Sequence, residues 1–250
     1  ARLEENLQAQ QRFIADAAHQ MRTPLTGLRM QTDLALMETD PIQVHRSLIH
    51  ISQSAERAGH LINQLLSLAR AEASYEKIYA VERVDLETLL RAMLSDFVPR
   101  ARQKNIDFGL ETTGAPLLID GNPVLLGELV KNLIDNAIKY TPEGGCVTVH
   151  TIATERAILE VEDTGIGVPD VDRERVFERF YRVLGSTESG SGLGLPIVRE
   201  IAELHRAKVS LIPNPSGKGT IAQVVFPRSR AGEEAPTPEA RPPTDQFPPA

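Results

Sequence analysis

The sequence predicts an α+β protein in which an antiparallel helical hairpin precedes a mixed layer of helices and strands. Apolar or small residues recur at alternating gaps of three and four along residues 3–38 and again along 41–73, which is the period of a packed helix seam. A short turn joins the two stretches, with Asp40 as the expected N-cap and Pro41 at the first helical position. We expect a helix from about Leu86 to Lys104, with Asp85 as its N-cap. Two strand pairs beyond it are close enough to form hairpins, Val147–Ala153 with Ala157–Glu162 and Lys208–Ile212 with Ile221–Phe226. This mixture of helices and hairpins favours α+β over a doubly wound parallel sheet.

The two helices of the hairpin carry more apolar surface than one hairpin can bury. Further leucines widen the stripe on both helices, so we expect two copies to form a dimeric four-helix bundle. The first seam is Leu7, Gln10, Ile14, Ala17, Met21, Pro24, Leu28 and Ala35; the second is Val44, Leu48, Ile51, Ala55, Ala58, Ile62, Leu65 and Ala69; the widening residues are Leu25, Leu34, Leu61 and Leu66.

Composition limits the function classes. The chain has 250 residues, 41% of them hydrophobic, which suffices for two domains with an aliphatic core. A net charge of −7 argues against a general nucleic-acid binder. The single cysteine, Cys146, excludes an intrachain disulfide, and no apolar run reaches the roughly eighteen residues of a membrane span. Because the seam is already running at Leu3, we expect a fragment of a longer protein.

His19 is the first candidate for chemistry. On the helical wheel it lies furthest from the seam, with Asp16 and Thr23 on its own face. Pro24 removes an amide donor and weakens the helix beside the imidazole. A solvated surface histidine is the alternative, and His60 occupies the same wheel position, so exposure alone does not single out His19. The proline and the polar cluster distinguish it.

A second candidate is a polar stripe on the helix expected from Pro123 to Tyr140. Glu128, Asn132, Asn136 and Tyr140 follow one another at four-residue steps, and Lys139 lies alongside. Amide oxygens suit Mg²⁺, which keeps waters and shares phosphate oxygens, and a lysine would neutralise phosphate charge. An ordinary amphipathic helix that shows amides to solvent is the alternative. The opposite face is apolar: Leu125, Leu129, Leu133 and Ala137.

Two glycine clusters follow. Gly165 and Gly167 come directly after Asp163 and allow close approach of a flat ligand, while the carboxylate could accept a hydrogen bond from an exocyclic amine. The loop from Gly190 to Pro196 runs into a helix, where backbone amides can cradle phosphate. Its spacing fits neither a Walker A loop nor a Rossmann fingerprint. The alternatives are a common turn and, for residues 176–182, a helix that merely packs its aromatic side chains.

The order and spacing of these clusters resemble the catalytic core of sensor histidine kinases of two-component systems, over about residues 1–227. His19 to Leu25 is similar to the phosphoacceptor box, 132–140 to the asparagine box, 163–167 and 190–194 to the glycine boxes, and Phe177–Phe180 to the phenylalanine box. The resemblance implies a dimerisation and phosphoacceptor hairpin (1–73), a linker (74–84), an ATP-binding α/β sandwich of the histidine kinase and gyrase type (85–227) and a disordered Pro-rich tail (228–250).

The resemblance also implies roles. His19 would take the γ-phosphoryl group of ATP, Asn136 would hold Mg²⁺ and Asp163 would bind adenine N6. The implied phosphate contacts are Asn132, Lys139, Tyr140 and Arg182, and the implied lid hinges are Gly190, Gly192 and Gly194. The implied partners are a second copy of the chain and the receiver domain of a response regulator. The chain would be the cytoplasmic portion of a bacterial inner-membrane sensor, with its membrane-anchored region upstream. The wording FIADAAHQMRTPL is similar to sensors of tricarboxylate uptake.

Two departures from the family pattern bear on catalysis. Gln20 stands where most relatives carry a carboxylate, so it can accept a hydrogen bond from the imidazole but not a proton. Asp16 is the one nearby carboxylate on the helix that could serve instead, and Thr23 could orient water for a phosphatase reaction. The lid between Arg182 and Gly192 is short and lacks a basic residue of its own.

Two other functions stay open. One is an ATPase of the gyrase, mismatch-repair or heat-shock-chaperone kind, which would need a glutamate at Asn132 to activate water. The other is a catalytically dead coiled-coil dimerisation module. Intact asparagine and glycine boxes argue against the second.

Overall fold

The computed structural model describes residues 21–22, 24–73, 81–184, 188 and 190–229, with the side chains of 56–57, 60–61 and 63–73 left aside. Four residues of the predicted phosphoacceptor site, Asp16, His19, Gln20 and Thr23, lie outside the described residues. So do most of the linker expected at 74–84 and of the tail expected at 228–250.

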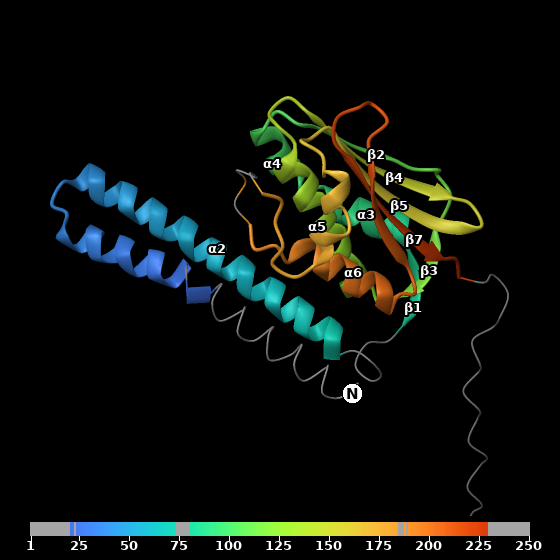
Figure 1. The fold of residues 1–250 in the computed structure, drawn as a ribbon, viewed down its shortest axis with the longest axis horizontal. Coiled ribbons are helices and arrows are strands. Elements are labelled where there is room, and N and C mark those ends of the chain that lie inside the picture. The colour runs from blue at the N-terminus through green and yellow to red at the C-terminus, as the bar shows by residue number, and fades with distance from the viewer. Residues whose placement is uncertain (1–20, 23, 74–80, 185–187, 189, 230–250) are drawn as a thin grey trace, which may run out of the picture.

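The N-terminal part is a helical hairpin that projects from the α/β domain (Figure 1). Residues 24–37 are helical, and α2 spans Pro41–Ala73. Asp40 caps α2 as predicted: its Oδ1 accepts the Ile42 amide N–H at 3.0 Å. Several large apolar side chains of the hairpin face solvent in the single chain, among them Leu25, Met30, Leu34, Leu36, Met37, Ile42 and Leu48.

The α/β domain begins with β1 (Glu82–Asp85), α3 (Leu86–Leu94) and α4 (Val98–Gln103). The prediction of a single helix from Leu86 to Lys104 is therefore wrong. The helix is interrupted between α3 and α4, so two shorter helices form. Pro99 has no amide hydrogen and its ring crowds the carbonyl four residues earlier, so the helix restarts with the proline in its first turn.

Asp85 caps α3, as the sequence predicts. Its carboxylate accepts the Glu87 amide N–H at 3.2 Å and the Thr88 hydroxyl at 2.6 Å. Partial burial acts to raise the pKa of Asp85, but these hydrogen bonds and one from the Leu117 amide outweigh it, so the pKa is lowered.

A mixed five-stranded sheet forms the centre of the domain. Its strand order is β2-β4-β5-β7-β6; only β2 and β4 pair in parallel, and β1 pairs separately with β3. The α+β prediction and the two predicted hairpins, β4–β5 and β6–β7, are confirmed. The strands are β2 (Asp107–Glu111), β3 (Leu118–Gly121), β4 (Cys146–Ala153), β5 (Arg156–Asp163), β6 (Lys208–Pro213) and β7 (Thr220–Pro227).

Helices α5 (Pro123–Tyr140) and α6 (Gly194–Leu204) pack against each other and cover one face of the sheet (Figure 1). The predicted apolar face of α5 is buried, with Leu129 and Leu133 no more than 2% exposed. It meets inward-facing residues of the strands such as Val149, Leu159 and Val224, which alternate with outward-facing polar ones. The core is aliphatic, as the composition predicts. Among the helices that the structure describes, none combines the length and apolarity of a transmembrane span.

Candidate active site

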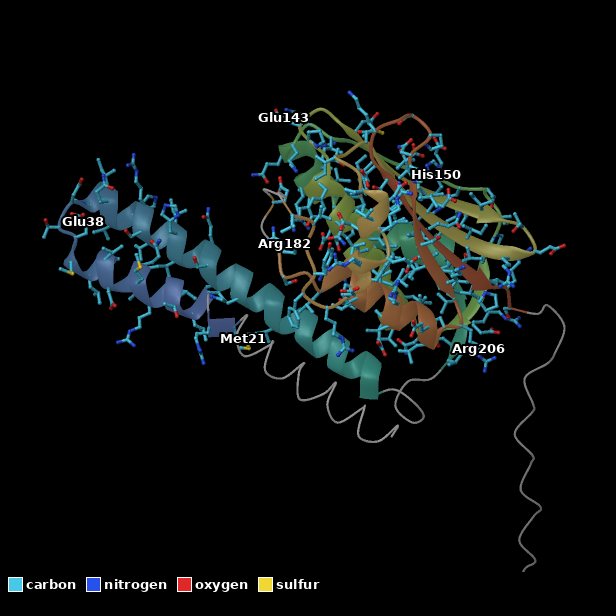
Figure 2. All side chains as sticks on the ribbon, in the orientation of Figure 1. Met21, Glu38, Glu143, His150, Arg182 and Arg206 are labelled. Atoms are coloured by element: carbon cyan, nitrogen blue, oxygen red, sulfur yellow. The ribbon has the colours of Figure 1, made fainter. Side chains whose placement is uncertain are left out.

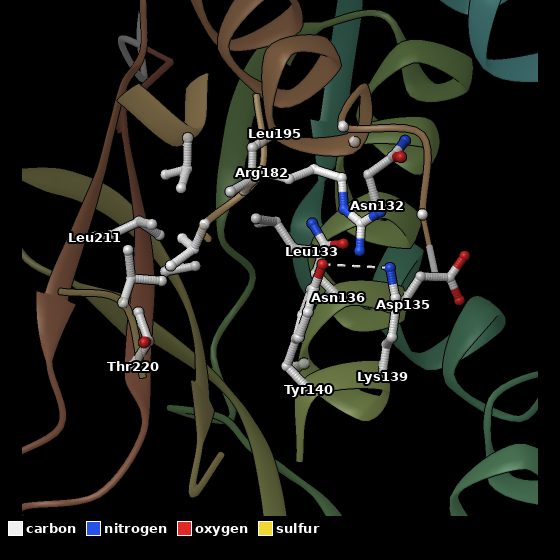
Figure 3. A pocket seen from close by; sticks show the side chains of 18 of the residues that line it. Asn132, Leu133, Asp135, Asn136, Lys139, Tyr140, Arg182, Leu195, Leu211 and Thr220 are labelled. Atoms are coloured by element: carbon white, nitrogen blue, oxygen red, sulfur yellow. Dashed lines mark hydrogen bonds between the residues drawn. The ribbon is translucent and has the colours of Figure 1, made fainter. Parts of the chain in front are cut away.

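A cavity of about 720 Å³ opens between α5, the end of β5, residues 181–184 and 190–192, and the first turn of α6 (Figure 3). This volume suits a ligand of nucleotide size. Figure 3 shows amide and basic side chains gathered on the α5 side and aliphatic ones toward β6 and β7. The lining includes Asn132, Asn136, Lys139, Tyr140, Asp163, Gly167, Arg182, Gly190, Gly192, Gly194, Leu211 and Thr220.

The asparagine residues of α5 lie beneath the N-terminus of α6. Asn132 is buried, and its Nδ2 donates to the Glu128 carbonyl at 2.8 Å, which leaves its amide oxygen as the free acceptor. A Cβ on Gly194 would lie 3.2 Å from Asn136 Nδ2 and 3.3 Å from Asn132 Oδ1. A glycine there lets the helix start approach both amides, which places unsatisfied helix N–H groups beside amide oxygens.

Lys139 and Tyr140 close the C-terminal end of this stripe. The Lys139 ammonium donates to the Tyr140 hydroxyl at 3.3 Å and lies 4.7 Å from the centre of that ring, as Figure 3 shows. A Cβ on Gly190 would lie 2.3 Å from Lys139 Nζ. The glycine-rich segment therefore approaches the lysine so closely that a side chain at Gly190 would displace the ammonium group.

Asp163 forms the opposite end of the cavity, where β5 ends. Its Oδ1 accepts the amide N–H groups of Gly165 at 2.8 Å and Thr220 at 3.3 Å. Burial raises the pKa of Asp163 above its ordinary value, although the two amide bonds oppose the shift. Gly165 fits tightly between this carboxylate and the end of α5: its Cβ would lie 2.6 Å from the Tyr140 carbonyl oxygen.

A backbone hydrogen bond joins the chain at the two ends of the segment expected to act as a lid. The Phe180 amide donates to the Gly192 carbonyl at 2.9 Å. Both residues have positive φ, 63° and 70°, and a Cβ on Gly192 would lie 2.7 Å from the Phe180 backbone, so this contact requires glycine. Arg182, which is on the cavity wall and is labelled in Figure 2, donates to the Glu188 carbonyl.

The phenylalanine box lies in the chain between two residues that line the cavity, Val176 and Tyr181. Phe177 is buried in a short 3-10 turn rather than in the α-helix of the alternative interpretation. The Arg199 guanidinium of α6 lies 4.3 Å from the centre of its ring. The Tyr181 hydroxyl donates to Asp172 at 2.5 Å, and this bond raises the pKa of Tyr181.

These residues fit ATP. A half-buried carboxylate, Asp163, lies at an aliphatic end and can accept from the adenine amine. The other end offers Lys139, Arg182 and the amides of the α6 N-terminus to phosphates. They also fit Mg²⁺ shared with a ligand. Across the described residues there is no group of three His, Cys, Asp or Glu side chains that could hold a metal, so the Asn136 oxygen would need phosphate oxygens and water to complete the shell.

The structure brings the predicted asparagine and glycine residues together, although the sequence analysis missed other lining residues. Arg100 and Asp135 line the cavity and form an ion pair, and the aliphatic end includes Leu211 from β6. These contacts join residues more than thirty positions apart, and no local pattern predicts them. Pro24 of the hairpin also lines the cavity.

Comparisons with known proteins agree with this geometry. Residues 9–74 match the family model "His Kinase A (phospho-acceptor) domain", and residues 121–230 match "Histidine kinase-, DNA gyrase B-, and HSP90-like ATPase". The sensor protein QseC of Escherichia coli K12 is 40% identical over 210 residues, which cover 84% of this chain and 46% of QseC. The chain thus spans about half the length of this relative.

Two solved structures are also similar. The mycobacterial sensor histidine kinase MprB is 34% identical with a TM-score of 0.52; the match covers 60% of this chain and all of that one. The histidine kinase ThkA, solved in complex with the response regulator protein TrrA, has a TM-score of 0.73 at 21% identity, with 90% of this chain and 64% of that chain covered. The second likeness shows the fold. With both family models, QseC and MprB in agreement, the chain belongs to the sensor histidine kinases.

Proposed function

We propose that this chain uses ATP to phosphorylate its own His19 and passes the phosphoryl group to an aspartate of a response regulator. The proposal extends to residues 1–73 as the dimerisation and phosphoacceptor hairpin and to 85–227 as the ATP-binding domain. It also includes residues 74–84 as a linker, whose last residues from Glu82 already belong to strand β1 of the α/β domain, and 228–250 as a disordered tail.

One observation carries the proposal. Pro24 lines the same cavity as Asn136 and Lys139, and it lies only five positions after His19 in the sequence. Met21, two positions after His19, packs against the buried core of the α/β domain. Among the described residues of the motif that resembles a phosphoacceptor box, Pro24 therefore borders the cavity that fits a nucleotide.

The reaction follows from the groups at the two sites. One ring nitrogen of neutral His19 uses its lone pair to form a bond to the γ-phosphorus, and the bond from that phosphorus to the bridging oxygen breaks, so ADP leaves with the electron pair. The other ring nitrogen then releases its proton, to Asp16 or to water, because Gln20 cannot accept it. Catalysis rests mostly on positioning and charge neutralisation, which Lys139, Arg182 and the α6 N-terminus would supply.

The cation and the nucleotide contacts are part of the proposal. Asn136 would hold Mg²⁺, which when bound would neutralise phosphate charge. Asp163 would accept from adenine N6, next to the tight turns at Gly165 and Gly167. Asn132 and Tyr140 would contact phosphates, and Gly190, Gly192 and Gly194 would let the lid close over them.

Two partners are proposed. A second copy of the chain would cover the apolar side chains that the hairpin exposes, such as Leu25 and Leu34, which are 54% and 52% exposed. A response regulator would take the phosphoryl group; ThkA, which shares the fold, was solved with such a protein. Thr23 would orient water for the reverse, phosphatase reaction.

The assignment to a tricarboxylate-uptake subfamily rests on the sequence around His19 alone, and the similarity to QseC and MprB lends it no support.

The alternative ATPase is disfavoured by one residue. Asn132 bonds its Nδ2 to a backbone carbonyl and has no group that can take a proton from water. The dead dimerisation module is disfavoured by the cavity itself, whose lining collects the asparagine and glycine residues in one place.

Incubation with γ-labelled ATP, followed by acid and alkali treatment, tests the proposal. The expected product is protein-bound label that is lost in acid and survives alkali, as a phosphoramidate does. His19→Gln should abolish the label and keep nucleotide binding, whereas the matched His50→Gln, an exposed histidine on α2, should label normally. Released phosphate without labelled protein would favour the ATPase, absence of nucleotide binding would favour the dead module, and label on His19→Gln would refute the assignment of His19.

A further inference from the structure

Lys104, directly after α4, makes an unusual set of contacts with the end of α5. Its ammonium donates to three backbone carbonyls, those of Ile138 at 3.0 Å, Lys139 at 2.8 Å and Thr141 at 3.0 Å. An ammonium group has three hydrogens, so all of them are used. This lysine lies outside the matched ATPase family model, which begins at residue 121.

These carbonyls lie at the C-terminal end of α5, where backbone carbonyls lack hydrogen-bond donors within the helix. The last four carbonyls of an α-helix have no intrahelical donor. In α5 the Ala137 carbonyl accepts from the Thr141 amide, and Lys104 takes those of Ile138 and Lys139. A cation at this end also interacts favourably with the helix dipole. Lys104 therefore fixes the turn that carries the side chains of Lys139 and Tyr140.

Neighbouring contacts hold the lysine itself in place. The Lys104 carbonyl accepts the Gly144 amide N–H at 3.2 Å, and Asn105 Nδ2 donates to Glu143 Oε1 at 2.7 Å. Arg100, one turn earlier, pairs with Asp135 on α5. Arg100, Lys104 and Asn105 thus contact both α5 and the turn that follows it.

We propose that Lys104 is a positioning residue for the nucleotide phosphates. It lines no part of the cavity, and it acts by holding the last turn of α5 so that the Lys139 ammonium and the Tyr140 hydroxyl stay at the phosphate end. This inference rests on the proposed nucleotide function. Asp163, at the adenine end, accepts from the Gly165 and Thr220 amides. Although Gly165 fits closely against the Tyr140 carbonyl, these two bonds hold Asp163 without Lys104, so loss of Lys104 should affect the phosphate end more than the adenine end.

Lys104→Met keeps the aliphatic stem and removes the three donors. We expect the variant to bind the ATP analogue AMP-PNP about tenfold more weakly, which corresponds to 1.4 kcal/mol. Its affinity for AMP, which has one phosphate, should change less than threefold. Lys131→Met is the matched control, since Lys131 is an exposed lysine on α5 itself. It removes one positive charge from the surface of α5 without touching the end of that helix.

Binding of both nucleotides to the full chain is measured by calorimetry, and folding is followed by thermal melts without nucleotide. Equal losses for AMP and AMP-PNP, or no loss for either, would overturn the inference and leave Lys104 a purely structural cap. If Lys104→Met does not fold, Lys104→Gln, which keeps two amide donors, is measured instead and should show the same selectivity in weaker form. An unchanged ratio of the two affinities in that variant also overturns it. If the unmodified chain binds neither nucleotide, the proposed function itself fails.

Discussion

Replacement of Gly165 by alanine tests the contact that joins the adenine end of the site to α5. An added Cβ would lie 2.6 Å from the Tyr140 carbonyl oxygen, whereas ordinary contacts begin at 3.4 Å. The backbone on one side must therefore move by roughly 0.8 Å, because the nearest atom, the Tyr140 carbonyl oxygen, belongs to the backbone. Overpacking of this kind costs about 1–3 kcal/mol. Because the displaced turn carries Lys139, nucleotide affinity should fall at least about tenfold.

Gly109→Ala provides the matched control. Gly109 lies in β2, and an added Cβ would meet nothing within 4 Å. There the same substitution should stabilise the fold by about 0.4–1 kcal/mol, since alanine restricts the unfolded chain more than glycine does. Urea unfolding of both variants, together with AMP-PNP titration, measures the two effects. Equal free energies of unfolding for the two variants would refute the steric argument.

Three further predictions concern the proposed chemistry. Asn136→Ala should abolish Mg²⁺-dependent nucleotide binding and autophosphorylation together; a variant that still labels itself at ordinary Mg²⁺ concentrations would show that the metal role is wrong. Asp163→Asn places an amide N–H opposite the amine N–H of adenine, so two donors would face each other. The affinity for ATP should therefore fall at least about tenfold, while the affinity for GTP stays unaffected. Equal losses for ATP and GTP would contradict adenine recognition. Gln20→Glu should raise the single-turnover autophosphorylation rate and Asp16→Asn should lower it, within the roughly 10²–10⁴-fold range of general-base help; if neither changes the rate, proton removal is not limiting.

The parts of the fold that could be predicted from the sequence are those coded by local periodicity. Helix α5 begins and ends where Pro123, Tyr140 and the following Thr141-Pro142 predict, because caps and prolines act within one turn. The order of the strands in the sheet could not be predicted in the same way. The parallel pair β2–β4 joins strands separated by the whole of β3 and α5, and only tertiary packing determines which edges meet.

The residues of the candidate site also divide into those that local spacing predicts and those that depend on tertiary packing. Asn132, Asn136 and Lys139 share one face of a helix, so their spacing predicted a common site. Lys104 and Arg100 belong to a segment that the sequence predicted as the end of a longer helix, and their contacts with α5 depend on the break near Pro99. Pro24 lies at the cavity because the hairpin packs against α6. No sequence motif predicts that packing.

His205 makes the start of α5 sensitive to pH. Its Nε2 accepts the Asn122 amide N–H at 3.0 Å, and its other ring nitrogen lies 2.7 Å from the Ile201 carbonyl, to which it must donate. Asn122 in turn caps α5 through the amides of Val124 and Leu125. Burial lowers the pKa of His205 below its ordinary value of 6.5, although the Ile201 bond opposes the shift. The folded state therefore favours the neutral ring.

The sign of the pH dependence follows from this pKa. Between the lowered folded pKa and 6.5, the unfolded state binds more protons than the folded state, so the free energy of unfolding falls as pH falls through that window. The slope from one such group cannot exceed about 1.4 kcal/mol per pH unit. Urea unfolding at pH 7.5, 6.5 and 5.5 measures it, and His205→Gln, which retains an acceptor for Asn122, should flatten the profile. An NMR titration of the wild-type His205 ring that gave a pKa above 6.5 would reverse the expected sign and refute the reasoning, because the protonated ring would then be the form that the fold stabilises.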